Sequence, residues 1–195
     1  AGGYSYEKHK KNYKLMHRAS LLFQIFGDKK YANYVKEMLN GYVELFPKLE
    51  LHPNGKSYSP GKLFWQGLND AMWLIHIVQA YDCVYYELSV AERTAVEKQL
   101  LRPLADFLSA GSPKMFNRVH NHGIWLNAAV GMTGYVLKDE ELVHSALHGA
   151  AIDKTLEIYK LVDYNDSSLK GFDPDRPAGY YMQLDNLFSP DGYFT

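Results

Sequence analysis

Hydrophobic residues recur along the first part of the chain three or four positions apart, which is the spacing of a helix with one buried face. The clearest runs are Tyr13, Met16, Leu21, Leu22 and Ile25, and then Tyr31, Tyr34, Val35, Met38, Tyr42 and Leu45. Between them, Gly27 suits the left-handed position that ends a helix, and Asp28 can accept hydrogen bonds from the free N–H groups of the next one. The pattern predicts an all-α protein that begins with a helical hairpin.

A loop and a central helix are expected next. Residues 47–61 carry three prolines and two glycines, which disfavour a helix there. A loop of this length is typical of a binding segment, and His52, Lys56 and Tyr58 would supply the contacts. From Leu63 to about Tyr86 the sequence is apolar on most sides, as expected of a central helix.

Further helical pairs complete the chain. Ser89 and Glu92 have the spacing of a capping box, which predicts a helix to about Leu108 with a kink at Pro103. Helices are also expected over residues 124–137, 139–161 and 178–188, with a loop over 164–177. The turns at 27–31 and 137–142 are alike, a faint internal repeat. Consecutive helical pairs favour a layered or toroidal α/α arrangement in a single domain over residues 1–195.

Composition and charge narrow the possible functions. The 195 residues are 47% hydrophobic and 14% aromatic, which is typical of a globular chain and excludes a disordered one. Lys and Arg total 21 against 22 Asp and Glu, so no overall field attracts nucleic acid or an anionic membrane. The longest weakly polar run, residues 128–137, is much shorter than the roughly 20 residues of a membrane helix. We therefore expect no nucleic-acid partner and no membrane span.

The densest polar cluster is Asn-Arg-Val-His-Asn-His-Gly over residues 117–123, just before a run of small apolar residues. At a helix N-terminus the free N–H groups and the helix dipole favour an anion. Asn121 and His122 can both donate hydrogen bonds to a carboxylate, so an acidic substrate fits this place. The alternative is structural, with Asn121 capping the helix and His120 packing in the core.

A second set of polar residues opens the central helix. Lys62, Gln66 and Asn69 are expected one turn apart on one face, where they would line a sugar groove. Trp65 suits either such a groove or the core, because an indole ring also stacks on a pyranose. Trp73 and His76 are expected in the core.

Other kinds of site find little support in the sequence. His120 and His122 are spaced like zinc ligands, but no third ligand stands at a recognisable spacing, so we expect no metal and no cofactor in this chain. Cys83 lies in an apolar helical stretch and is expected to be a buried structural cysteine. Four carboxylates leave a glycosidase pair open, although no two have a distinctive setting: Asp70, Asp82, Glu87 and Asp185.

Longer segments are more specific than any of these patterns. They span residues 2–13, 59–69, 116–125, 129–134 and 183–195, and include Phe-Asn-Arg-Val-His-Asn-His-Gly-Ile-Trp and Gln-Leu-Asp-Asn-Leu-Phe-Ser-Pro-Asp-Gly-Tyr-Phe-Thr. In these segments the chain resembles the alginate and oligoalginate lyases of polysaccharide lyase family seventeen, relatives of the heparinase II/III group. The resemblance implies an incomplete (α/α) toroid that is followed, in the family, by a β-sandwich domain absent from this chain.

The resemblance also implies a reaction. Asn121 and His122 map onto the family's Asn-His pair, which holds and neutralises the uronate carboxylate, so that a base can remove the C5 proton while the C4 oxygen leaves by β-elimination. Lys62, Gln66 and Arg118 become candidate substrate contacts. The family's catalytic tyrosine lies beyond the last segment, so Tyr193 is assigned only a groove-lining role.

The hypothesis favoured by the sequence is a periplasmic or secreted lyase, with its signal peptide removed, that acts on alginate or its oligosaccharides exolytically and gives an unsaturated uronate. The alternatives are a heparinase-like lyase of glycosaminoglycans and a uronate-binding α/α fragment without turnover. Sulfated substrates call for more cations than the chain supplies near the site, which favours the unsulfated polymer. The partner is then an anionic polysaccharide, and the chain alone holds only half of the proposed site.

Overall fold

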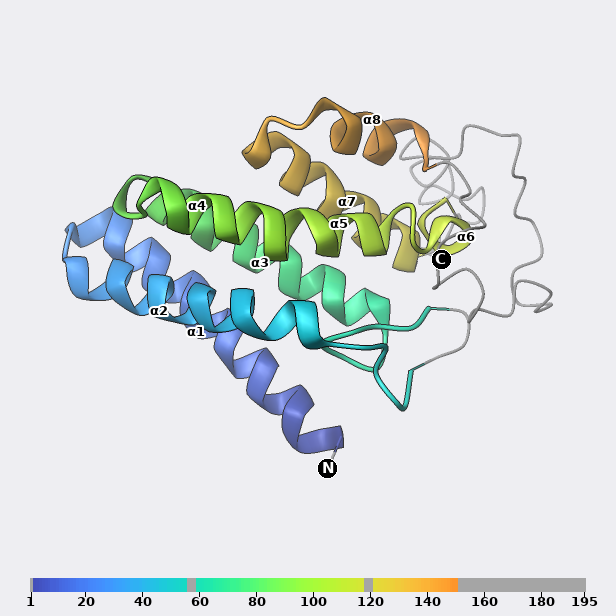
Figure 1. Ribbon diagram of the computed structural model, residues 1–195, viewed down its shortest axis with the longest axis horizontal. Coiled ribbons are helices and arrows are strands. Elements are labelled where there is room, and N and C mark those ends of the chain that lie inside the picture. The colour runs from blue at the N-terminus through green and yellow to red at the C-terminus, as the bar shows by residue number, and fades with distance from the viewer. Residues whose placement is uncertain (1, 56–58, 118–120, 151–195) are drawn as a thin grey trace, which may run out of the picture.

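The computed structural model describes residues 2–55, 59–117 and 121–150, and the regular secondary structure of this part is helical throughout (Figure 1). The elements are α1 (Gly2–Phe26), α2 (Lys29–Leu45), η1 (Phe46–Lys48), α3 (Gly67–Val84), η2 (Tyr85–Glu87), α4 (Val90–Val96), η3 (Glu97–Leu101), α5 (Arg102–Leu108), α6 (Pro113–Phe116), α7 (Asn121–Leu137) and α8 (Glu140–His148). The all-α prediction is confirmed for these residues. The helix expected over 178–188 and the loop over 164–177 lie outside them.

Two of the helical turns use the same local device, as their sequences suggested. Gly27 has a φ of 67° after α1, and the Asp28 carboxylate accepts from the N–H of Lys30 at 3.0 Å to cap α2. Lys138 has a φ of 55° after α7, and Asp139 caps α8 in the same way. The predicted first hairpin is confirmed, and α7 and α8 form a second one of the same kind.

The helix predicted from Ser89 to Leu108 is present as α4, η3 and α5. The capping box is complete, because the N–H of Glu92 donates to Ser89 Oγ at 3.2 Å and the N–H of Ser89 donates to Glu92 Oε2 at 2.7 Å. Before Pro103 the chain makes one π-helical turn, in which the N–H of Arg102 reaches back to the Glu97 carbonyl. Proline has no N–H and its ring crowds the preceding turn, which a wider π turn relieves.

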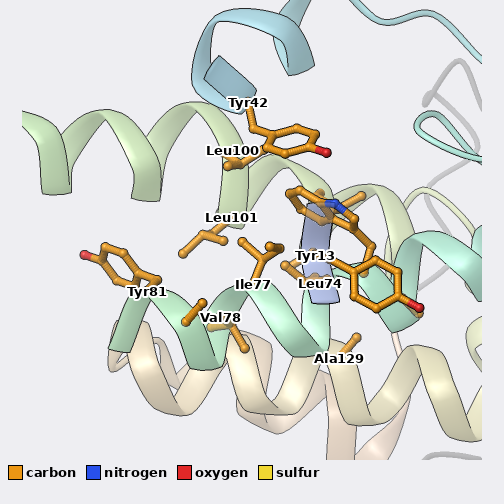
Figure 2. Close-up of a cluster of buried hydrophobic side chains, with 14 of the residues drawn as sticks. Tyr13, Tyr42, Leu74, Ile77, Val78, Tyr81, Leu100, Leu101 and Ala129 are labelled. Carbon is orange, nitrogen blue, oxygen red and sulfur yellow. The ribbon is translucent and has the colours of Figure 1, made fainter. Parts of the chain in front are cut away.

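The helices form two layers (Figure 1). Helices α1, α3 and α7 pack side by side in one layer, and α2 lies beside the α4–α5 rod in the other. Figure 2 shows Ile77 and Val78 of α3 between the leucines of η3 and Ala129 of α7. The core therefore lies around α3, and Trp73 is fully buried in it, as predicted.

Two residues of α3 are less buried than the sequence predicted. Cys83, expected in the core, is only partly buried, because it lies near the end of α1, where the Gln24 amide donates to its carbonyl. His76 is also half-buried. Its Nδ1–H donates to the Met72 carbonyl at 2.7 Å and its ring packs against Tyr13, so the ring has a partner as expected but lies at the edge of the core.

Helix α8 is shorter than predicted and closely packed on α7. A Cβ on Gly134 of α7 would lie 2.8 Å from the backbone nitrogen of Val143, so only glycine permits this approach. Helix α8 ends at His148 instead of about Leu161, because Gly149 turns the chain with a φ of 94°. Within the described residues, no helix is long and apolar enough to cross a bilayer.

Candidate functional site

The segment before α3 is folded around one buried carboxylate. Asp70, in the first turns of α3, is fully buried. Its Oδ2 accepts from the N–H of Lys62 at 2.6 Å, and its Oδ1 accepts from the N–H of Phe64 at 2.9 Å. The central helix predicted from Leu63 is therefore wrong at its start, because these N–H groups bond to a side chain and the helix begins at Gly67.

Because α3 begins at Gly67, the helical face predicted to line a sugar groove is not formed. Gln66 is extended, with a φ of −143°, and Lys62 lies before it in a non-helical turn. Lys62, Gln66 and Asn69 therefore do not share one helical face, as the sequence had suggested. Lys62 and Gln66 belong instead to a non-helical stretch of six residues, segment 61–66.

Segment 61–66 is tightly folded and tied to its neighbours. The N–H of Gly67 donates to the Ser59 carbonyl at 3.0 Å, and the N–H of His52 donates to the Gly61 carbonyl at 2.8 Å. A Cβ on Gly61 would lie 2.3 Å from the Phe64 carbonyl oxygen, closer than any real contact, so only glycine fits. The backbone of the segment has little freedom.

Gln66 brings this segment into contact with the polar cluster identified from the sequence. Its Nε2 lies 3.1 Å from Nε2 of His122, and both residues are buried, at 8% and 6% exposed. An amide nitrogen can only donate, so Nε2 of His122 accepts and the imidazole carries its proton on Nδ1. The structure therefore brings together two of the predicted site residues that are 56 positions apart.

Asn121 and His122 are the first two residues of α7, whereas the sequence placed them before the helix. Asn121 is thus part of the helix, not its cap, and its side chain is exposed beside the buried His122. Arg118 and His120 lie outside the described residues, and so does Tyr193. The described half of the cluster offers one exposed amide and one buried imidazole at a helix N-terminus.

Asn117, which opens the same polar cluster, has a structural task. Its Nδ2 donates to the Ala150 carbonyl at 2.8 Å, and its Oδ1 accepts from the N–H of Ala150 at 2.8 Å. Asn127 donates to the Phe116 carbonyl at 3.2 Å. These bonds tie the approach to α7 to the end of α8, a role that the sequence pattern did not distinguish from substrate binding.

Lys62 is held against aromatic rings. Its ammonium lies 5.3 Å from the ring centre of Phe46 and 5.5 Å from that of Phe107. Such cation–π contacts restrict a long side chain without neutralising its charge. The Lys62 side chain of segment 61–66 is therefore held close to η1 and α5.

One hollow adjoins this segment, and a second one lies next to the first. A groove of about 700 Å³ is lined by residues 48–54 together with His9, Lys62 and Leu63, and its charged side chains include Lys48 and Glu50. A second hollow of about 490 Å³ between α1 and α2 shares His9 with it. Of the loop residues predicted to bind, His52 lines the groove, whereas Lys56 and Tyr58 lie outside the described residues. The groove has more basic than acidic side chains.

His9 is a groove residue that sequence reasoning missed. Its Nδ1 lies 2.9 Å from Tyr42 Oη, which also accepts from Asn12 Nδ2 at 3.2 Å. Burial lowers the pKa of His9, and the charges of Lys8 and His52 act in the same direction. The lowered pKa favours the neutral form of the His9 imidazole. Its partner Tyr42 is 33 positions away, so no local spacing indicated the pair.

Within residues 2–55, 59–117 and 121–150, no three His, Cys, Asp or Glu side chains lie close enough together to hold a metal ion. Of the two histidines with the spacing of zinc ligands, His122 lies within those ranges and His120 lies outside them. The described residues offer hydrogen-bonding groups and positive charge.

Comparison with known proteins agrees with this chemistry. A family model described as alginate lyase matches residues 7–157. The chain is 45% identical over 194 residues to an exo-oligoalginate lyase of Saccharophagus degradans and 40% identical over 193 residues to an alginate lyase of Stenotrophomonas maltophilia. The alignments cover 100% and 99% of this chain but only 23% of each relative. With most of its length matched by the family model, the chain belongs to the alginate lyase family.

Proposed function

We propose that this chain contributes to a polysaccharide lyase that cleaves alginate or its oligosaccharides by β-elimination. Family membership supports the reaction class, and the names of both relatives support the substrate. The structural observation that carries the proposal is the buried imidazole of His122, held by Gln66 at the start of α7 beside the exposed amide of Asn121.

In the proposed reaction, Asn121 and His122 bind the carboxylate of a uronate. Their hydrogen bonds, together with the N-terminal end of α7, stabilise the negative charge that builds up on this group when C5 loses its proton. The C5–H electron pair forms the C4=C5 double bond, and the C4–O bond breaks with its pair on the leaving oxygen. We assign the base to none of the described residues, and Tyr193 keeps its proposed groove-lining role.

The groove beside segment 61–66 supports an unsulfated anionic polymer as substrate. Lys48 and Lys62 are cations on its wall, and His9 and His52 add hydrogen-bonding groups. A polymer with one carboxylate per sugar needs few cations, whereas a sulfated one needs more. Arg118 remains a proposed substrate contact.

The remaining proposals concern the whole protein. Its helical pairs continue as an (α/α) toroid, its action is exolytic, and it works in the periplasm or outside the cell. The name of the first relative supports the exolytic mode. The elimination requires a base and charge stabilisation and no cofactor in this chain.

The experiment is to follow the ultraviolet absorbance of the unsaturated product, with the full-length protein of the gene and with this chain, on alginate oligomers, heparan and chondroitin. His122→Ala in the full-length protein is expected to lose about a hundredfold or more in kcat with an unchanged circular dichroism spectrum. His144→Ala, on the exposed face of α8, is the matched control.

Product from alginate alone supports the proposal. Product only from heparan or chondroitin would move the protein to glycosaminoglycans, and no product from any uronate would overturn the lyase. A His122→Ala variant with wild-type rates would remove His122 from the site while leaving the reaction class in place.

A further inference from the structure

Asp70 is a fully buried carboxylate that the proposed reaction does not use. Burial raises its pKa to about 7, while the N–H groups of Lys62, Phe64 and Leu63 act in the opposite direction. A group that costs so much to bury is retained only where its bonds are needed. With 0% exposure it cannot touch a substrate, which also removes it from the glycosidase pairs that the sequence left open.

The bonds of Asp70 determine the course of segment 61–66. Its two oxygens hold the N–H groups of Lys62 and Phe64 at 2.6 and 2.9 Å, so the backbone between them wraps around the carboxylate. The ring of Phe64 packs edge-on against Tyr6 and His9 of α1, with ring centres 5.2 and 5.8 Å apart. The segment is therefore held on one side by α3 and on the other by α1.

The same course places Gln66 against His122. Only one residue separates Phe64 from Gln66, and the N–H of Gly67 is fixed by the Ser59 carbonyl. These constraints restrict the position of the Gln66 side chain, and its amide nitrogen lies 3.1 Å from Nε2 of His122. A change in the backbone at residues 62–64 would move this amide and release Nε2.

We propose that Asp70 is a positioning residue of the lyase site: its carboxylate shapes segment 61–66 so that Gln66 covers Nε2 of His122 and holds the imidazole in one tautomer and orientation. The inference rests on the function proposed above for His122. A carboxylate that merely stabilised the fold would leave His122 unchanged in any variant that still folds. A positioning carboxylate changes His122 and the turnover together.

The first test measures kcat and KM on alginate oligomers for the full-length enzyme and its variants Asp70→Asn, Gln66→Ala and the double variant. Asp70→Asn keeps the volume but places an amide donor against a backbone N–H. We expect kcat to fall about tenfold to a hundredfold, KM to change less, and the double variant to be no worse than the poorer single one. Val78→Ala, two turns further along α3 and fully buried, is the control for lost stability.

The second test does not depend on turnover. Diethyl pyrocarbonate modifies neutral imidazoles, and mass spectrometry gives the rate at each histidine. Because Gln66 covers Nε2 of His122, we expect this histidine to react several-fold faster in both Asp70→Asn and Gln66→Ala, while His144 keeps its rate. If Asp70→Asn does not fold, Asp70→Ser, which keeps one acceptor oxygen, takes its place.

A folded Asp70 variant with the wild-type kcat and the wild-type His122 reactivity would overturn the positioning role, and so would multiplicative effects of Asp70→Asn and Gln66→Ala. An inactive wild-type enzyme would instead overturn the proposed function. In that case the His122 modification rates still show whether Asp70 acts through Gln66.

Discussion

The first turns and the middle of helix α3 are held in place by different forces. Its middle buries apolar side chains such as Trp73 and Ile77 between the two helix layers, where contacts are numerous and have no fixed direction. Its first turns bury Asp70, whose few hydrogen bonds are directional and join it to backbone groups of the preceding segment. The fold and the proposed site therefore use one helix but depend on different parts of it, so we expect substitutions to damage them separately.

The largest expected effect is a loss of stability when the apolar contacts around the middle of α3 are reduced. Leu101, fully buried in the π-helical turn, faces the middle of α3 (Figure 2). Leu101→Ala should lower the free energy of unfolding by about 2–5 kcal/mol, since it leaves a cavity, while kcat of the folded enzyme stays the same. Chemical unfolding and steady-state kinetics would check this. Leu21→Ala on the exposed face of α1 is the control. A large loss of kcat in Leu101→Ala would show that the apolar part of α3 also shapes the site.

Gly61→Ala tests segment 61–66, which Asp70 in the first turn of α3 holds in place. The new Cβ would overlap the Phe64 carbonyl and force segment 61–66 to move. We expect kcat/KM on alginate oligomers to fall about a hundredfold, equivalent to about 3 kcal/mol. Gly41→Ala in α2 has open space around its Cβ and should stabilise the helix by about 0.5–1 kcal/mol without loss of activity. Equal effects of both substitutions would argue against a tightly folded segment.

The buried carboxyl group of Asp70 should also make the stability of the protein depend on pH. Burial raises the pKa of Asp70 to about 7, well above the usual value of an aspartate, so between about pH 4 and pH 7 the folded state binds more protons than the unfolded state. Stability from this group therefore falls as pH rises through that window, by about 2–3 kcal/mol between pH 5 and pH 8. The asparagine in Asp70→Asn does not titrate, so this contribution to the pH dependence is absent from the variant.

Thermal unfolding at pH 5 and pH 8 gives the measurement. The wild type should lose Tm relative to Asp70→Asn as the pH increases. A difference in Tm between the two proteins that is independent of pH would mean that Asp70 is ionised in the folded protein across the whole window.

The smallest expected effect lies in the groove. Lys48 is exposed on its wall, so Lys48→Ala removes a solvent-screened contact with a substrate carboxylate. We expect KM for longer alginate oligomers to rise only two- to fourfold, less than about 1 kcal/mol, with the effect fading at high salt. Lys11→Ala on the exposed side of α1 is the control. If KM rose equally for the shortest oligomers, Lys48 would not contact a part of the substrate that only longer oligomers have.

Residues close in sequence predicted their own structure well. Asp28 and Ser89 cap helices by accepting from N–H groups two and three residues later, and such bonds depend on a few neighbouring residues. The buried Trp73 followed from the apolar stretch around it. The errors were at ends of elements, where a glycine at 149 or a buried carboxylate at 70 outweighed the helical pattern.

Residues near one another in the chain were enough to predict the all-α architecture, the capped hairpins and the family, because helix periodicity, caps and motifs are local features. The packed helices were needed to show that Asp70 is fully buried, that segment 61–66 wraps around it, and that Gln66 meets His122 across 56 positions. These contacts depend on how α1, α3 and α7 pack. A spacing rule describes one helix at a time and says nothing of which side chains two helices bring together.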